Sequence, residues 1–204
     1  MKRIALVLYS CFLFLFLFVG CATSSIDTAL LRPSGIKVNP LLPRLDISND
    51  KKVSFSSADT NLVTENSYFY TIFERELETN ICDDYGEKLG SIELVLIDNR
   101  IKETGLGFSV LSGFTLFIPN LVGMPMDSFD YSLEFEIRIF ANNGERVWKH
   151  AYSSQGRVYS VIFNGFKSWS TDDQLKQFKE LLEQCKRDLS RDSSLIRTRL
   201  DENK

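Results

Sequence analysis

The chain has 204 residues, 44% of them hydrophobic, with 24 Lys and Arg against 27 Asp and Glu. This length supports a single domain of ordinary size that can bury a proper core. A net charge of −3 without any basic tract argues against nucleic acid, so we expect no nucleic-acid partner.

The first 20 residues have the organisation of a secretory signal peptide. Lys2 and Arg3 precede an uncharged stretch from Ile4 to Gly20 that is rich in Leu, Phe and Val. Such a basic start stays on the cytoplasmic side while the apolar stretch enters the bilayer. An uncleaved anchor helix is the alternative, because about 17–25 apolar residues can span a membrane.

Phe18-Val19-Gly20-Cys21 resembles the lipobox of bacterial lipoproteins, although Phe18 stands where that family usually has Leu. In the family, a diacylglycerol is joined to the cysteine thiol, and cleavage makes this cysteine the new N-terminus. The resemblance implies a cleaved signal peptide over 1–20, a lipid on Cys21 and a lipidated N-terminus and linker over 21–50. Ala22, where an Asp would resemble an inner-membrane retention signal, implies an outer-membrane anchor facing the periplasm.

Cys82 and Cys185 are the other cysteines that remain after cleavage. The periplasm is oxidising, so these two residues could form a disulfide. Two separate buried thiols are the alternative, because a free Cys behaves as a small hydrophobic residue.

The segment after the linker predicts a strand, a helix and a second strand. "KKVSFSS" (51–57) is a short strand candidate, and residues 63–82 carry apolar side chains at three- and four-residue steps, which predicts an amphipathic helix. "SIELVLIDNRI" (91–101) has apolar residues on both faces, which predicts a strand covered on both sides.

Residues 104–126 run for 23 residues without a charge. Four glycines, Pro119 and Pro125 argue against a transmembrane helix. A buried strand near 114–118 followed by a capping loop is the interpretation we favour. An exposed apolar hairpin is the alternative, with the aromatic cluster at 158–169 beside it. Its candidate contacts with a membrane or partner are Phe114, Phe117, Leu121, Val122 and Met124.

The last elements are a strand hairpin and a helix. Residues 131–141 alternate strictly between apolar and polar, Asn143-Gly144 predicts a tight turn, and 146–154 form the return strand. A helix follows from about Asp172 to Ser190, with Thr171 and Gln174 fitting a capping box. Its apolar face comprises Leu175, Phe178, Leu181, Leu182, Cys185 and Leu189. The charged tail 191–204 is expected to fray.

This order predicts an α+β fold in one domain over 51–190, with helices 63–82 and 172–190 packed on one face of a mainly antiparallel sheet. The layout resembles that of small Gram-negative envelope lipoproteins, such as the YajG group and the lipoprotein activators of peptidoglycan synthases. Such a resemblance concerns architecture rather than a shared motif.

Catalytic chemistry is sparse in this sequence. The single histidine, His150, lies between Trp148 and Tyr152 on the return strand, and no nucleophile motif, phosphate loop or metal-ligand spacing occurs. We therefore expect no cofactor, no metal and no enzymatic activity. The expected function is that of a membrane-anchored binding or assembly module with an envelope protein as its partner.

The alternative is an oligomeric secretion or pore-forming lipoprotein, similar to curli-type secretion lipoproteins, whose segment 104–126 contacts or enters the outer membrane. A membrane β-hairpin should contain two alternating stretches of about 9–11 residues. Segment 104–126 has at best one, which favours the binding module.

Overall fold

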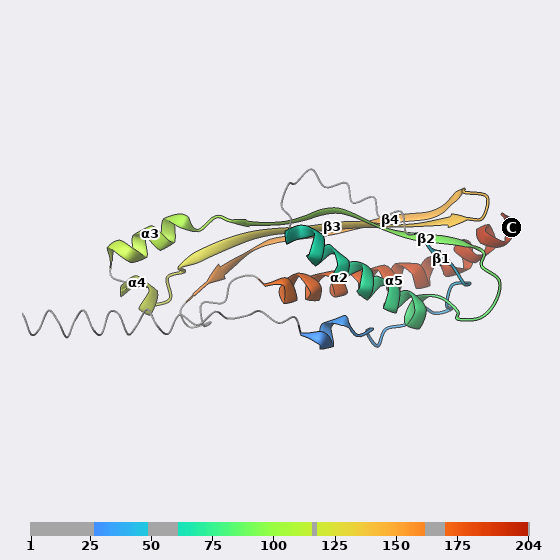
Figure 1. Ribbon diagram of the computed structural model, residues 1–204, viewed down its shortest axis with the longest axis horizontal. Helices are drawn as coiled ribbons and strands as arrows, with labels where there is room; N and C mark the ends of the chain where they lie inside the picture. The colour runs from blue at the N-terminus through green and yellow to red at the C-terminus, as the bar shows by residue number, and fades with distance from the viewer. Residues whose placement is uncertain (1–26, 49–60, 116–117, 162–169, 204) are drawn as a thin grey trace, which may run out of the picture.

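The structure is a computed structural model that describes residues 27–48, 61–115, 118–161 and 170–203. It is an α+β fold in which a long, four-stranded mixed sheet carries two long helices, α2 and α5, on one face (Figure 1). In chain order the elements are η1 (Thr28–Leu31), β1 (Asp46–Ile47), α2 (Asn61–Glu76), η2 (Leu77–Ile81), β2 (Gly90–Glu103), α3 (Leu106–Phe114), α4 (Ile118–Leu121), β3 (Asp127–Ala141), β4 (Arg146–Ser160) and α5 (Thr171–Glu202).

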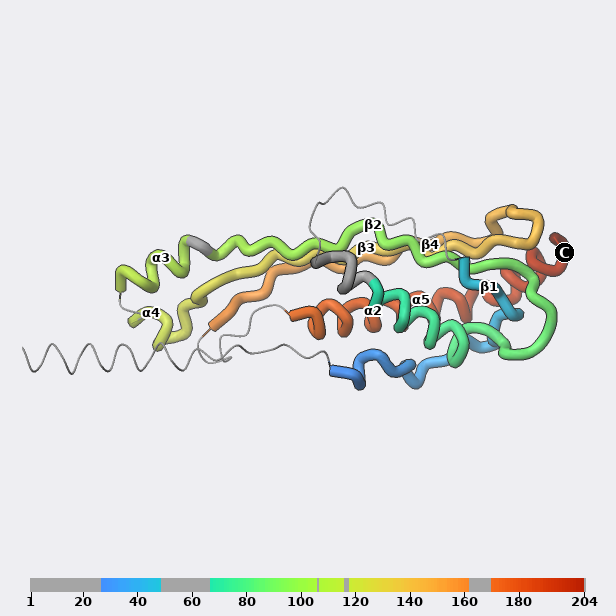
Figure 2. Tube along the Cα trace, in the orientation of Figure 1, coloured from blue at the N-terminus to red at the C-terminus, as the bar shows by residue number. Residues whose placement is uncertain are grey.

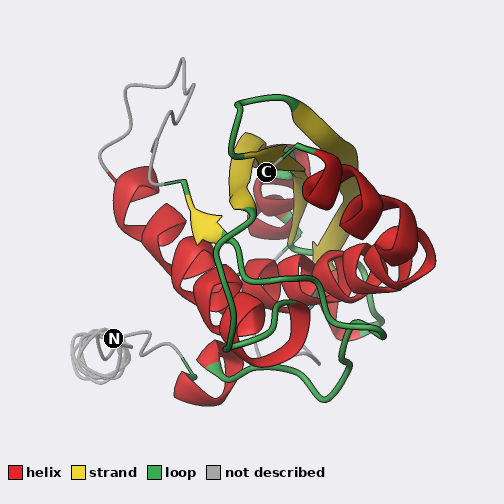
Figure 3. Ribbon diagram, turned by 90° about the vertical axis from the view of Figure 1, so that its right-hand side faces the viewer, coloured by secondary structure: helices red, strands yellow, loops and turns green. Residues whose placement is uncertain are grey.

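The sheet has the strand order β1-β2-β3-β4. Strands β2, β3 and β4 are antiparallel neighbours, whereas the short β1 runs parallel to β2. The predicted hairpin is confirmed, because Gly144 has a φ of +84° in the turn that joins β3 to β4. This turn lies beside the C-terminal end of α5, where Asn143 Nδ2 donates a hydrogen bond of 2.9 Å to Asn203 Oδ1. That end of the molecule faces the viewer in Figure 3.

The core lies between the sheet and the two helices. Phe178 of α5 is fully buried at its centre, with ring centroids 4.9 Å from Phe69 of α2 and 5.0 Å from Phe135 of β3. The predicted apolar face of α5 is confirmed, and the inward side chains of β3 form the opposite wall. Those inward side chains are Leu133, Phe135, Ile137, Ile139 and Ala141.

The other face of the sheet carries ion pairs within and between strands, and among the described residues no second apolar layer covers it. Arg138 pairs with Glu93 and Glu136, and Lys149 lies 2.7 Å from Glu136. The expectation that β2 is covered on both sides is therefore wrong. Ile97 points to this face and is 41% exposed, and no element in the described ranges packs over it.

Helix α5 begins one residue earlier and ends later than the sequence pattern suggested. Ser170 is its N-cap, and its side chain and backbone exchange hydrogen bonds with Asp173 in a capping box. The predicted Thr171–Gln174 pair is wrong because Gln174 points inward, where its amide donates to Asn99 Oδ1 at 3.2 Å.

The expected fraying after Ser190 is also wrong. Ser193, Ile196 and Leu200 are at most 2% exposed, because they continue the three- and four-residue spacing of the buried face. The helix is thereby held against the body as far as Glu202.

Residues 27–48, which we expected to form part of a loose linker, pack against the body. Val38, Leu42 and Leu45 are almost fully buried, and β1 adds to the edge of β2. The predicted strand at 51–57 lies outside the described residues.

Candidate functional site

The uncharged segment between β2 and β3 forms two short helices, α3 and α4, rather than a buried strand. Thr104 donates its backbone N–H to Ser128 O at 2.8 Å, which brings the ends of the two strands together. At Gly105 a Cβ atom would lie 2.2 Å from the Ser128 nitrogen, so the chain can turn into α3 only with glycine here. The prediction of a buried strand near 114–118 is wrong.

We call Gly105–Pro125 the apolar tip. Its most exposed side chains are Phe114 at 85% and Val122 at 86%. Four further large apolar side chains, Val110, Leu111, Ile118 and Leu121, are 46–64% exposed.

The candidate contact residues from the sequence divide into three groups. Phe114, Leu121 and Val122 lie together on the exposed tip, and Met124 is half-buried. Phe117 lies outside the described residues. Val110 and Leu111 were missed, although they lie four and three residues before Phe114 on α3, a spacing that could have identified them with it. Ile118, at the start of α4, was also missed.

Polar side chains hold the tip in this shape from within. Asn120 is fully buried, and its amide donates to Met124 O at 3.1 Å and Pro125 O at 3.4 Å. Ser109 Oγ donates to Met126 O at 2.8 Å, which ties α3 to the start of β3. Ser109 and Asn120 thus use their donor groups inside the tip and at its base, whereas Ser112 Oγ and Asn120 Oδ1 are buried without a hydrogen-bond partner among the described residues. The large apolar side chains of the tip face outward.

The tip lies beyond the part of the sheet that the helices cover (Figure 2). The first turn of α5 is level with Asn99 of β2, since Gln174 hydrogen-bonds Asn99 there. Strand β2 continues for four more residues to Glu103 before the tip begins. At a rise of about 3.3 Å per residue, the base of the tip is about 13 Å beyond the start of α5.

The described chain begins on the tip side of α5. Asp27 donates its backbone N–H to Asp172 Oδ1, at the first turn of α5, over 3.3 Å. Five residues lie between Cys21 and Asp27, and the six Cα–Cα steps that join the two reach about 20 Å when extended. A group attached to Cys21 can therefore extend past the base of the tip.

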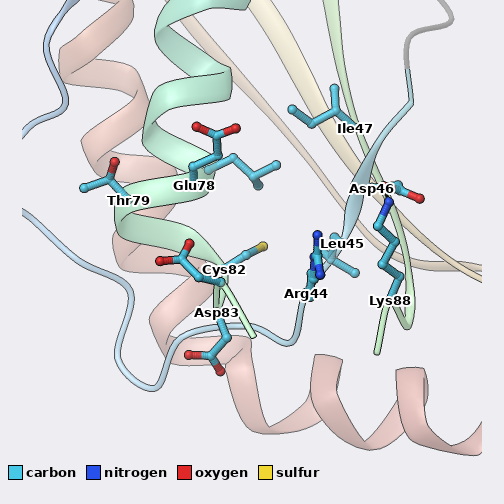
Figure 4. Close-up of a pocket in the computed structure, with 11 residues that line it drawn as sticks. Arg44, Leu45, Asp46, Ile47, Glu78, Thr79, Cys82, Asp83 and Lys88 are labelled. Carbon is cyan, nitrogen blue, oxygen red and sulfur yellow. Dashed lines mark hydrogen bonds and ion pairs between the residues drawn. The ribbon is translucent and has the colours of Figure 1, made fainter. Parts of the chain in front are cut away.

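A polar cleft of about 650 Å³ opens where η2 meets the segment around β1 (Figure 4). Its lining includes Arg44, Asp46, Glu78 and Lys88, and the Lys88 ammonium pairs with the Asp46 carboxylate. Cys82 borders this cleft, and burial raises the pKa of its thiol to about 12, so it is a poor nucleophile at neutral pH.

The structure contains no disulfide between Cys82 and Cys185, both of which are free and buried. Cys82 follows η2 and pairs with Leu42 of the N-terminal segment. Cys185 points from α5 to the hydroxyl of Tyr152 on β4, and burial raises the pKa of its thiol to about 12. The two thiols thus make different contacts within the core. They are two separate buried thiols, which is the alternative to a disulfide that the sequence left open.

His150 lies on the seam between β4 and α5. Its ring stacks on Trp148 with centroids 5.9 Å apart, and its Nε2 is 3.9 Å from Asp188 Oδ2. The neighbouring Trp148 indole donates to Asp192 at 3.0 Å, and Tyr152 donates to Asp188 at 3.1 Å. These contacts join a strand to a helix.

Glu76 and Lys186 form an ion pair in the interior that the sequence did not predict. The two side chains are 1% and 0% exposed, and Lys186 Nζ lies 2.9 Å from Glu76 Oε2. Asn80 donates to Glu76 Oε2 and the Ser34 backbone N–H donates to Glu76 Oε1, each at 2.6 Å. Lys186 also donates to Ser34 Oγ.

This cluster connects the N-terminal segment to both helices. Burial raises the pKa of Glu76, but the hydrogen bonds from Asn80, Lys186 and Ser34 outweigh it, so the pKa is lowered overall and the carboxylate stays charged. Because these partners enclose the carboxylate, its role is structural.

Among the residues that the structure describes, no group of three or more His, Cys, Asp or Glu side chains is placed to hold a metal ion. No helix there combines the length and apolar character that crossing a bilayer requires.

Comparisons with known proteins give distant structural likenesses only. No protein-family model and no curated protein matches the chain. A crystal structure of a Xanthomonas campestris protein of the family DUF330 is 9% identical with a TM-score of 0.36, covering 88% of this chain and 97% of that one. A minor lipoprotein from Acinetobacter baumannii is 9% identical with a TM-score of 0.29, covering 78% of this chain and 96% of that one. Likenesses of this size support no inference about the activity of this chain.

Proposed function

We propose that the protein is an envelope lipoprotein that acts as a non-enzymatic binding or assembly module. In this proposal, Cys21 carries the lipid in the outer membrane and the folded body faces the periplasm. The observation that carries the proposal is the apolar tip, which is presented at one end of a long body whose free sheet face is charged.

The elongated shape of the molecule supports a role in which one end is held at the membrane and the other end is available to a partner. Helix α5 has 32 residues, which corresponds to about 48 Å. The tip lies at one end of the long axis, and the turn between β3 and β4 lies at the other (Figure 1). Such a body can hold a periplasmic partner at a fixed distance from the membrane.

The polar side chains in the body support binding rather than chemistry. Glu76 and Lys186 neutralise each other in the closed interior, and the cysteine thiols have raised pKa values. His150 is half-exposed and lies against the helix seam. None of these groups combines an activated nucleophile or base with an enclosed space for a substrate.

The secretion or pore-forming alternative finds less support. Helix α3 has nine residues and a length of about 14 Å, against about 30 Å for a bilayer core. The tip is therefore suited to contact a surface rather than to line a transmembrane channel.

The test is a complementation and labelling experiment on the full-length protein in its own host. The wild type should incorporate a fatty-acid analogue, and Cys21→Ser should lose both the label and the cellular phenotype of the wild type. His150→Ala should leave the phenotype intact, whereas Leu121→Asp should lose it while folding normally.

Leu195→Asp is the matched control, because Leu195 is a comparably exposed leucine (53%) on α5, away from the tip. Loss of phenotype in His150→Ala together with retention in Leu121→Asp would overturn the binding-module proposal. A wild type without fatty-acid label would overturn the lipoprotein assignment.

A further inference from the structure

The described chain begins beside the first turn of α5, which is the end of that helix nearer the apolar tip (Figure 1), and this arrangement bears on what covers the tip. We propose that the tip inserts into the lipid bilayer that holds the lipid on Cys21, and that it enters the same leaflet. This inference rests on the proposed lipidation of Cys21 and names the contact that the tip makes.

The first support is the composition and exposure of the tip. Between Glu103 and Asp127 the chain carries no charge over 23 residues, and six large apolar side chains face outward. An apolar patch of this kind normally marks contact with a protein or a membrane. Charges resume abruptly at Lys102 and Glu103 on one strand and at Asp127 and Asp130 on the other, which sets a boundary across the hairpin.

The second support is that the backbone of the tip suits an apolar environment. Most of its described residues are in α3 and α4, where backbone bonds such as Thr115 N–H to Leu111 O and Val122 N–H to Pro119 O lie within the segment, although no side chain caps the N-terminus of α3. Asn120, Ser109 and Thr115 use their side chains on backbone carbonyls of the tip or its base. Insertion therefore moves apolar side chains out of water without stripping many polar groups of their partners.

The third support is the reach of the anchor. Asp27 is fixed at the first turn of α5, and the base of the tip is about 13 Å farther along the sheet. The six Cα–Cα steps back to Cys21 reach about 20 Å, so the lipid and the tip can meet one bilayer surface. Helices that lie in a membrane interface bury their apolar face by about 5–10 Å, a depth the tip can reach without crossing the leaflet.

The consequence is a fixed orientation. A lipid on a flexible leash holds the protein near the membrane but leaves the body free to tilt. A second contact through the tip constrains the long axis and directs the β3–β4 turn away from the bilayer.

The experiment uses the full-length, lipidated protein in liposomes of phosphatidylethanolamine and phosphatidylglycerol, with or without lipids that carry a nitroxide quencher. Val122→Cys is labelled with a polarity-sensitive nitrobenzoxadiazole dye, and Glu145→Cys at the opposite turn is the matched control. The native thiols do not compete, because Cys82 and Cys185 are buried and Cys21 is blocked by its lipid.

At position 122 we expect blue-shifted emission and loss of most of the signal with nitroxide lipids, whereas the dye at position 145 should show neither. Blue-shifted emission without quenching at position 122 would overturn the inference, because a protein surface or the chain's own leader then covers the tip. Solvent-like emission at both positions would overturn it as well.

The two proposals fail in different ways. A protein without fatty acid on Cys21 contradicts the proposed function, whereas a lipidated protein with an unquenched dye at position 122 contradicts only insertion of the tip. Val122→Cys should retain the wild-type unfolding midpoint, which a circular dichroism melt checks, because Val122 is 86% exposed.

Discussion

At the scale of single residues, the most consequential contact is the buried pair of Glu76 and Lys186. A buried ion pair adds little net stability when it is intact, but removal of one partner leaves an unpaired charge in the interior. Here the pair also fixes Ser34, and through it the N-terminal segment that packs against the body.

Lys186→Met should lower the free energy of unfolding by about 3–5 kcal/mol, because the Glu76 carboxylate then lacks its counter-charge. Urea denaturation measures this loss. The double variant Lys186→Met/Glu76→Gln should recover more than half of it, since Gln keeps an acceptor for the Ser34 N–H without the charge. Equal losses in the single and double variants would show that the charge is not the cause.

The Glu76 carboxylate should also make the free energy of unfolding depend on pH. Its pKa in the folded protein lies below the ordinary value of 4.5, so its contribution is fully present above that value and is lost as the pH falls through the folded pKa. The stability difference between the wild type and Glu76→Gln should therefore shrink as the pH falls from about 5 to about 3. Chemical denaturation at a series of pH values measures this difference in the free energy of unfolding. A difference that stays constant with pH would contradict the lowered pKa of Glu76.

At the scale of elements, α5 organises the domain. One continuous face of this helix packs on β3 and β4 through Phe178 and Cys185, and farther along through Ile196 and Leu200. Its first turn is closed by the Ser170–Asp173 capping box, and its last turns lie beside the β3–β4 turn.

Phe178→Ala should reduce the free energy of unfolding by about 3–5 kcal/mol, because the ring is fully buried between Phe69 and Phe135 and would leave a cavity. Leu195→Ala, at an exposed position of the same helix, should change it by less than about 0.5 kcal/mol. Guanidinium denaturation of both variants gives the comparison. Similar effects would mean that helix propensity, rather than packing against the sheet, dominates.

At the scale of the whole molecule, the apolar side chains occupy two separate places. Most are in the core between the helices and one sheet face, and the largest group of exposed ones lies in the tip, away from that core. The stability of the domain and the contact made by the tip should therefore be separable by mutation.

The double variant Leu121→Asp/Val122→Asp should leave the thermal unfolding midpoint unchanged, because both side chains are already exposed to water. It should nevertheless abolish the protection of the tip against limited proteolysis that, under the proposed lipidation and insertion, membranes confer on the wild type. Calorimetry and proteolysis in liposomes provide the two measurements. A large fall in the midpoint would mean that the tip contributes to the core.

Local patterns in the sequence were sufficient for the hairpin of β3 and β4 and for the buried face of α5. Period-two alternation, an Asn-Gly turn and helical spacing depend on neighbouring residues, so they can be identified without the fold. The same patterns identified the α+β class and the helices on one face of the sheet.

The tertiary structure decided what the local patterns leave open. The hydrophobicity of segment 104–126 shows that its burial is favourable, but it does not show which surface covers the segment. The close approach of Gly105 to Ser128 places the segment beyond the core. Glu76 and Lys186 are separated by 110 residues, so only the packing of α2 against α5 brings their charges together. The sequence by itself therefore determined the β3–β4 hairpin and the buried face of α5 as far as Leu189, because these depend on local spacing. Contacts between distant residues determined which apolar surface is free and which charges are paired.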